Sequence, residues 1–478
     1  MRSGHGVIRA MTAALATIAL AAGLATGAPA AGPDRAALLT EAGKTTQRIA
    51  DPNARALAMA EVAAALWPTD QVKAQAMFGD ALQVTDRLDE PLAKIMGLRG
   101  VAVRQATVDP GPAKKALEAL ATRSSQLKYL GERALALREV GRALVPLDRA
   151  EAVKVLGQAK EAAEKIDANV FRSAALRDVA LAALPVAPDL ASQCLDAAQT
   201  ALKGAPNDPG LAMAQAELAA ALAQLSPERG YRLANEIKQD EVRRSAAAQI
   251  AESLAERSPD LALAAIRAVK DPQAQTLALA AAAAHVGVER GEIAAMLAEQ
   301  ALSRVATLGP EDRERVSGWC AEAFAATDPA RAAQMAAKLT NVDLRDETLA
   351  HVAVLQATAD PRAAMKVADR IDDMSQREGA IARIVPLLAK VDAQAAVDRA
   401  HGILARRAQV TALLAIVAVL TPVAKPITPP PPSSQPTKPS AAGPPAAPPA
   451  KPPTGGQPAT PPAKPPTADQ PVTDRPRN

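Results

Sequence analysis

Internal repetition is the feature that most constrains how this chain folds. Three segments that begin at Arg55, Arg133 and Arg172 align without gaps, and a weaker copy begins at Lys94, so these positions recur every 39 residues. Farther along the chain the period shortens to 32 residues, as shown by Arg313, Arg345 and Arg377. Self-similarity at such periods is typical of supersecondary units that stack side by side. The repeats therefore predict an array of similar units in chain order.

Each unit is predicted to contain two helices. Met59, Val62 and Leu66 fall at the i, i+3, i+7 spacing of one helical face. The second helix opens with Asp-Pro or Ser-Pro, which places an N-cap oxygen before a proline at the first helical position. The short turns that remain require neighbouring helices to pack antiparallel. This reading predicts an all-α fold of ten hairpins with first helices that start near residues 55, 94, 133, 172, 212, 244, 276, 313, 345 and 377.

Composition supports helices packed through alanine. Only 1% of the residues are aromatic, so a sheet would lack the side chains that fill pleated surfaces. The units resemble tetratricopeptide-type and HEAT-type repeats, although the consensus Trp and Tyr positions of the former are missing. The resemblance implies a right-handed α-solenoid with a concave side that binds proteins or peptides. We expect it over 31–421, with 39-residue repeats at about 55–210, 32-residue-type repeats at about 211–406 and a capping helix at 407–420.

The two ends of the chain differ from the repeats. Arg2 and Arg9, an uncharged run and the small-residue site around Ala30 predict a cleaved signal peptide at 1–30. The expected compartment is therefore outside the cytoplasm, the periplasm or the cell surface of a bacterium, with no membrane span after cleavage. From residue 422 to 478 the chain is rich in Pro, Ala and Lys, which predicts a disordered tail that acts as a spacer or as a docking segment.

A basic residue recurs at the start of the first helix. A cation beside the positive end of a helix dipole needs an offsetting anion. We expect these residues to pair with carboxylates of an adjacent helix in a structural ladder, with ligand contact as the alternative. The ladder comprises Arg55, Lys94, Arg133, Arg172, Arg313, Arg345 and Arg377.

A second row, formed by Arg99, Arg138 and Arg177, lies five positions along and about 140° around the helix. We expect these side chains to be solvated. As a stripe across three stacked repeats they are the candidate residues for binding an acidic segment. The alternative is that the neighbouring Glu139 and Asp178 neutralise them.

No recognisable catalytic constellation, metal site or cofactor motif appears in the sequence. Without the two arginines of 1–30 and the six cations and two acids of the tail, the middle has 47 basic and 49 acidic residues, which disfavours nucleic-acid binding. We therefore expect an exported scaffold with a protein or peptide partner. The alternatives are a glycan-processing or peptidoglycan-processing enzyme on a helical toroid, and a purely structural spacer.

Overall fold

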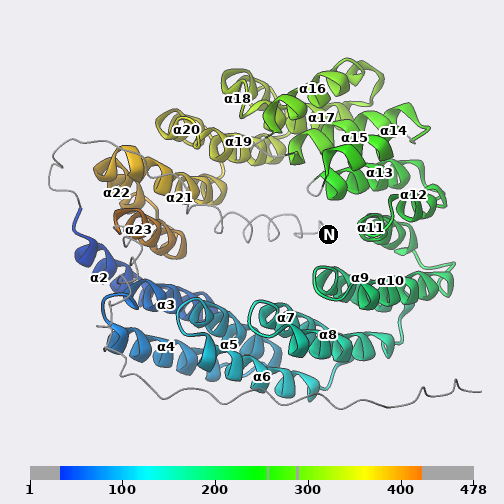
Figure 1. Ribbon diagram of the computed structural model, residues 1–478. Helices are drawn as coiled ribbons and strands as arrows, with labels where there is room; N and C mark the ends of the chain where they lie inside the picture. The colour runs from blue at the N-terminus through cyan, green and yellow to red at the C-terminus, as the bar shows by residue number, and fades with distance from the viewer. Residues whose placement is uncertain (1–32, 256–257, 268, 287–289, 422–478) are drawn as a thin grey trace, which may run out of the picture. The chain divides into compact units, whose positions relative to one another are not determined.

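The computed structural model describes residues 33–421 apart from 256–257, 268 and 287–289. The described residues form twenty-two α-helices and one 3-10 turn, with no strand (Figure 1). The predicted all-α fold of tandem helix pairs is confirmed. The predicted signal peptide at 1–30 and the predicted tail at 422–478 lie outside the described residues.

The helices alternate between two sets. The first helices of the pairs are α3 (Pro52–Leu66), α5 (Pro91–Ala106), α7 (Leu130–Leu144), α9 (Asn169–Ala183), α11 (Leu211–Ala223), α13 (Asp240–Ala255), α15 (Pro272–His285), α17 (Pro310–Phe324), α19 (Val342–Gln356) and α21 (Met374–Val391). The second helices are α4 (Gln71–Asp86), α6 (Pro110–Ser125), α8 (Arg149–Glu164), α10 (Pro188–Lys203), α12 (Pro227–Asn235), α14 (Pro259–Arg267), α16 (Gly291–Leu302), α18 (Pro329–Ala337), α20 (Pro361–Ala368) and α22 (Ala393–His401).

Each first helix packs on its own second helix and on the first helices of the neighbouring pairs. The second helices touch one another little, and each packs mainly on its own first helix and less extensively on the first helix that follows it. Because every pair contributes its apolar face to both neighbours, one core of buried side chains runs from Leu38 to Val417. The predicted stacking of two-helix units in chain order is therefore observed.

The change of period has a local cause. The second helices α4, α6, α8 and α10 have sixteen residues each, whereas α12, α14, α18 and α22 have nine. The difference of seven residues, about two helical turns, equals the change of the period from 39 to 32 residues. The first helices have 13–18 residues and do not shorten systematically, so the layer that they form is continuous across the change.

Side-chain caps start most of the second helices. Asp328 accepts a hydrogen bond of 3.0 Å from the backbone N–H of Arg331, and Asp360 accepts bonds of 2.9 and 3.0 Å from the next turn. In both helices a proline follows the cap at the first helical position. These bonds satisfy donors that a helix leaves free at its start, so the short turns predicted from the sequence have a physical basis.

Small residues allow the two helices of a pair to approach closely. A Cβ atom built on Gly230 of α12 would lie 2.6 Å from the carbonyl oxygen of Ala219 and 2.7 Å from the Cβ atom of Ala223, both on α11. The backbone of α12 therefore lies directly on α11. Any larger residue at position 230 would push the two helices apart.

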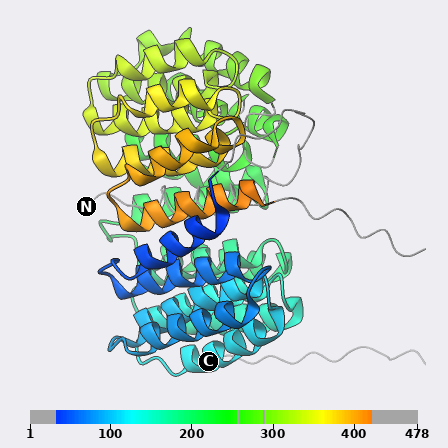
Figure 2. The ribbon, with the colours of Figure 1, turned by 90° about the vertical axis from the view of Figure 1, so that its left-hand side faces the viewer.

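The last described helix, α23 (Arg406–Leu420), closes the array. It packs on α21 as the next first helix, and it also packs on α3 and on α2 (Arg35–Thr46) near the N-terminal end of the described residues. Figures 1 and 2 both show α23 beside α2. Helix α2 contacts α23 and α3 in the way that other second helices contact their own and the following first helix. The two ends together form an eleventh pair, and the first helices form a closed circuit of contacts.

Candidate functional site

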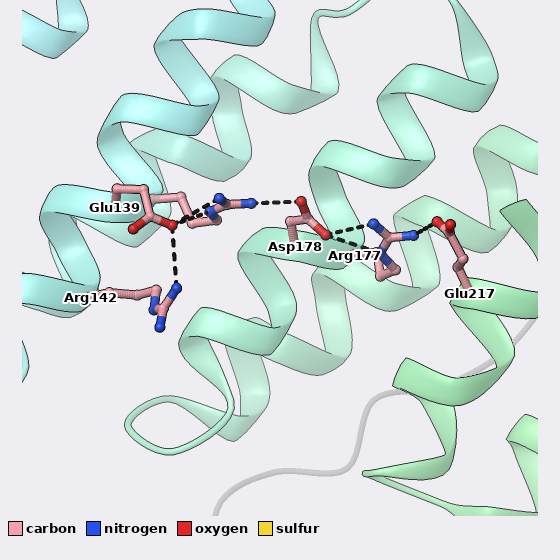
Figure 3. Close-up of polar contacts among 6 residues, drawn as sticks. Glu139, Arg142, Arg177, Asp178 and Glu217 are labelled. Atoms are coloured by element: carbon pink, nitrogen blue, oxygen red, sulfur yellow. Dashed lines mark hydrogen bonds and ion pairs between the residues drawn. The ribbon is translucent and has the colours of Figure 1, made fainter. Parts of the chain in front are cut away.

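The predicted arginine row is engaged in ion pairs between neighbouring units. Arg99 of α5 lies 3.3 Å from a carboxylate oxygen of Glu139 on α7, and Arg138 of α7 donates a hydrogen bond of 2.6 Å to Asp178 on α9. Arg177 of α9 pairs in the same way with Glu217 on α11 (Figure 3). The expectation that these arginines are solvated is wrong, because their side chains are only 15–25% exposed. Their predicted binding role stays a prediction.

Glu139 is the central acid of this row. It is buried, and it accepts hydrogen bonds from Arg138, of 3.1 and 2.8 Å, and from Arg142, of 3.3 Å, while Arg99 faces its other oxygen. Burial raises the pKa of Glu139, but the three guanidinium groups outweigh burial and hold the pKa below its usual value. Burial lowers the pKa of Arg99, and the charge of Glu139 only partly offsets it. One carboxylate thus forms ion pairs with three guanidinium groups.

A second carboxylate, Glu61 on α3, joins the two ends of the array. Arg407 of α23 donates hydrogen bonds of 2.7 and 2.5 Å to its two oxygens, and Arg104 of α5 lies 2.9 Å from one of them. We call the resulting set the arginine belt. It spans α23, α3, α5, α7, α9 and α11 and comprises Arg407, Arg104, Arg99, Arg142, Arg138 and Arg177 with Glu61, Glu139, Asp178 and Glu217.

The acids of the belt share the register of the repeat, a signal that the sequence analysis used only in part. Glu139, Asp178 and Glu217 are 39 residues apart, and Glu61 lies two periods before Glu139, with Gly100 between them. Reading this row of acids together with the arginine row would have predicted pairs between successive units. Glu139 and Asp178 were expected only to neutralise the adjacent arginines of their own helices.

Histidine–carboxylate pairs join other neighbouring first helices farther along the chain. His285 of α15 lies 3.2 Å from Glu252 of α13, and His351 of α19 lies 3.0 Å from Glu322 of α17. Burial lowers the pKa of His285, but the hydrogen bond and charge of Glu252, with the carbonyl of Ala281, outweigh it and raise the pKa to about 9. The hydrogen bond from Glu322 raises the pKa of His351. His285 therefore favours the charged form at neutral pH.

The predicted structural ladder uses a different partner from the one expected. Arg133 donates to the carbonyl of Leu127 at 2.9 and 2.6 Å, and Arg172 donates to the carbonyl of Ile166 at 2.6 Å. Arg313 and Arg377 also donate to carbonyls just before their own helices. These oxygens lie at the C-terminal end of the preceding helix, where a cation is favoured. At these four positions the arginine therefore binds a neutral backbone carbonyl and not the carboxylate that was predicted.

The other members of the ladder behave differently. Lys94 lies 3.3 Å from Asp86, and Arg345 pairs with Asp372, so a carboxylate partner is present at these two positions. Arg55 has a buried Nε atom without a hydrogen-bond partner. The ladder residues lie in the first turn of the first helices, and the belt residues lie where neighbouring first helices contact each other.

Sequence analysis missed an acid that follows the ladder arginine in the last units. Glu314, Asp346 and Glu378 recur every 32 residues, directly after Arg313, Arg345 and Arg377. Each accepts hydrogen bonds from backbone N–H groups at the start of the next first helix, and Glu378 does so at 2.9 Å from both Leu404 and Ala405. The arginines at 313 and 377 thus bind the turn before their own helix, and all three acids bind the turn before the next first helix. This period was visible in the sequence.

Within the part of the chain that the structure describes, no cluster of three or more His, Cys, Asp or Glu side chains could hold a metal ion. Cys194 and Cys320 are both buried and unpaired, and burial raises the pKa of each thiol to about 12. No described helix combines the length and the hydropathy that crossing a membrane requires.

Comparisons with known proteins add one structural likeness. A scan of protein-family profiles gave no match, and a search of curated proteins gave none. Among solved structures, the chain is similar to Ton1535 from Thermococcus onnurineus NA1, with 15% sequence identity and a TM-score of 0.33. The match covers 67% of this chain and 98% of the other.

Proposed function

We propose that this protein is an exported helical-repeat scaffold that holds a protein partner in the cell envelope. The sequence of residues 1–30 supports export, because a basic start, an apolar run and a small-residue site are the elements of a signal peptide. The tandem helix pairs supply a scaffold-like architecture. Neither feature identifies the partner.

The observation that carries the proposal is a row of exposed apolar side chains at one edge of the array. All first helices begin at the same edge, because the antiparallel second helix returns the chain each time. Six of the ten large apolar residues that are exposed in the described chain lie at or just before the start of a first helix: Tyr129, Phe171, Met213, Val342, Met374 and Leu404. We call this row the apolar edge.

Two aromatic residues are the strongest evidence that the apolar edge binds a protein. This chain has two Tyr and three Phe residues in all, yet Tyr129 is 61% exposed and Phe171 is 72% exposed. They start the adjacent helices α7 and α9, and Met213 starts α11 next to them. Exposed aromatic and methionine side chains that gather on neighbouring elements are typical of protein-binding surfaces.

Affinity capture from an envelope extract tests the proposal. The purified mature chain is compared with a variant that carries Tyr129→Ser, Phe171→Ser and Met213→Ser, and with a matched control that carries Val72→Ser and Val391→Ser at the opposite edge. We expect the wild-type and control chains to retain the same protein and the triple variant to lose it. Equal capture by the triple variant, or no protein specific to the wild-type chain, would contradict the proposal.

The closed circuit of first helices favours one alternative, an enzyme that processes glycan or peptidoglycan on a helical toroid. The low aromatic content opposes it, because such enzymes generally stack sugars on aromatic rings. Turnover of envelope polysaccharide by the purified chain would establish this alternative. The purely structural spacer remains the expected reading if neither a partner nor turnover is found.

A further inference from the structure

The arginine belt carries more positive than negative charge. It has six guanidinium groups and four carboxylates, and the surplus is uneven along the belt. Arg177 lies between two acids, Asp178 and Glu217. By contrast, Glu61 serves two arginines and Glu139 serves three. The surplus of cations therefore lies on α23, α5 and α7.

Arg142 and Arg104 have N–H donors that their pairs within the belt do not use. A guanidinium group has five N–H donors. Arg142 makes a single hydrogen bond, of 3.3 Å, to Glu139, and its side chain is 52% exposed. Arg104 makes one contact with Glu61, through Nη2, and its side chain is 37% exposed. Both residues can therefore bind a further anion without giving up their present pairs.

The two arginines lie on neighbouring helices at nearly equivalent positions. One repeat after Arg104 is position 143, so Arg142 differs from the matching position by one residue. Helices α5 and α7 pack against each other, and packed helices lie about 8–10 Å apart. In an extended peptide, side chains on one face are about 7 Å apart. Acidic side chains at alternate positions would thus meet Arg104 and Arg142 in turn.

The burial of Arg99 adds a second reason for an anion at this place. Its Nε atom is buried without a hydrogen-bond partner, and burial lowers its pKa. A carboxylate bound next to the group would reduce the cost of holding this cation away from water. The four carboxylates of the belt disfavour a polymer with a charge on every unit, such as nucleic acid or polyphosphate, because they would repel it.

We propose that Arg104 and Arg142, with Arg99 behind them, form a binding site for an acidic peptide segment with alternate Asp or Glu residues. This inference rests on the proposed function, since it assigns the chemistry of one segment of the protein partner. It also changes the site predicted from the sequence, because Arg138 and Arg177 are used in pairs within the protein. The peptide lies across α5 and α7, with successive carboxylates on the two arginines.

Fluorescence anisotropy with a labelled eight-residue peptide of alternating Glu and Ala tests this site. The peptide is titrated with the full mature chain, with an Arg104→Gln/Arg142→Gln variant and with a matched control, Lys154→Gln, in which an exposed lysine on α8 is changed. We expect the double variant to weaken binding by roughly tenfold or more, because a charge-assisted hydrogen bond contributes about that factor. The control is expected to bind as the wild type does.

Three further measurements make the result decisive. Circular dichroism is expected to show unchanged helix content in the double variant, because Arg407 still pairs with Glu61 and Arg138 with Glu139. The proposal also requires that binding weakens with added salt and that the matching Gln-Ala peptide does not bind. Equal binding by the double variant, no binding of the acidic peptide to the wild type, or stronger binding of polyphosphate than of the peptide would overturn it. Capture at the apolar edge can succeed or fail independently, so the two proposals are tested separately.

Discussion

Arg407 on α23 donates hydrogen bonds of 2.7 and 2.5 Å to the two carboxylate oxygens of Glu61 on α3, although the two residues are 346 positions apart in the chain. A neighbouring contact, between His401 and Glu41 on α2, joins the same two ends at 3.0 Å. The two ends of the described array are thus held together by polar contacts as well as by apolar packing.

Removing this pair is expected to loosen the closure selectively. Arg407→Gln should lower the free energy of unfolding by about 1–2 kcal/mol, because Glu61 is mostly buried and keeps only Arg104 as a partner. In urea unfolding, Arg399→Gln is the matched control. That residue pairs with Asp369 at an exposed site, where such pairs contribute about 0–1 kcal/mol. Amide exchange that is faster in α2 and α23 of the first variant only is expected, and equal effects of the two variants would contradict the assignment.

His285 gives the fold a pH dependence of defined sign. Its pKa is about 9 in the folded chain and about 6.5 when unfolded, so the folded state holds the proton more tightly. The stabilisation is complete below about pH 6.5 and is lost as the pH rises through 9. Between pH 6 and pH 9.5, the free energy of unfolding measured in urea should fall by about 2–3 kcal/mol more for the wild type than for His285→Gln. Parallel curves for the two proteins over this range would be inconsistent with the Glu252 contact.

Two glycines distinguish close packing from simple helix propensity. Gly230→Ala places a methyl group against the backbone of α11 and should destabilise the chain by about 1–3 kcal/mol. Gly157 on α8 has no atom within 4 Å of an added Cβ atom, so Gly157→Ala should stabilise by up to about 1 kcal/mol. Thermal unfolding of both variants measures the two signs. A stabilising Gly230→Ala would mean that α11 and α12 lie farther apart.

Glu378 is predicted to hold the start of α23. Its carboxylate accepts the backbone N–H groups of Leu404 and Ala405, both at 2.9 Å, and it is buried. Glu378→Ala leaves these donors without an acceptor and should destabilise by about 2–3 kcal/mol, whereas Glu378→Gln keeps one acceptor oxygen and should cost less. Urea unfolding gives the magnitudes. If amide exchange at Leu404 and Ala405 stayed unchanged in Glu378→Ala, the capping role would be wrong.

Local features of the fold could be predicted because they depend on neighbouring residues. The period of 39 and 32 residues, the apolar spacing of Met59, Val62 and Leu66, and the Asp-Pro caps each act within one unit. They fixed the all-α class and the order of ten hairpins. The shortening of the second helix by seven residues equals the change from the first period to the second.

The closure and the belt could not be predicted in the same way. Contact between α23 and α2 depends on the small rotation between units, summed over ten of them, and the helix at 407–420 was therefore expected to act as a cap. The angular position of Arg99 around its helix predicted a solvent-exposed side chain. Helical geometry alone does not show where the neighbouring first helix lies, so the burial of this side chain could not be predicted. The carbonyl of Leu127 lies in the turn just before the helix of Arg133, within reach of the guanidinium group. It therefore competes with any carboxylate for this arginine.

The closed circuit of first helices is tested most directly by one distance. Spin labels are placed at Lys44 on α2 and Thr411 on α23, both exposed, after Cys194 and Cys320 are replaced by alanine. Since packed helices lie about 8–10 Å apart, pulsed electron paramagnetic resonance should give a narrow distribution centred below about 30 Å. An open array of eleven first helices would separate the labels by roughly 80–100 Å, and a distribution centred near that value would contradict the closure.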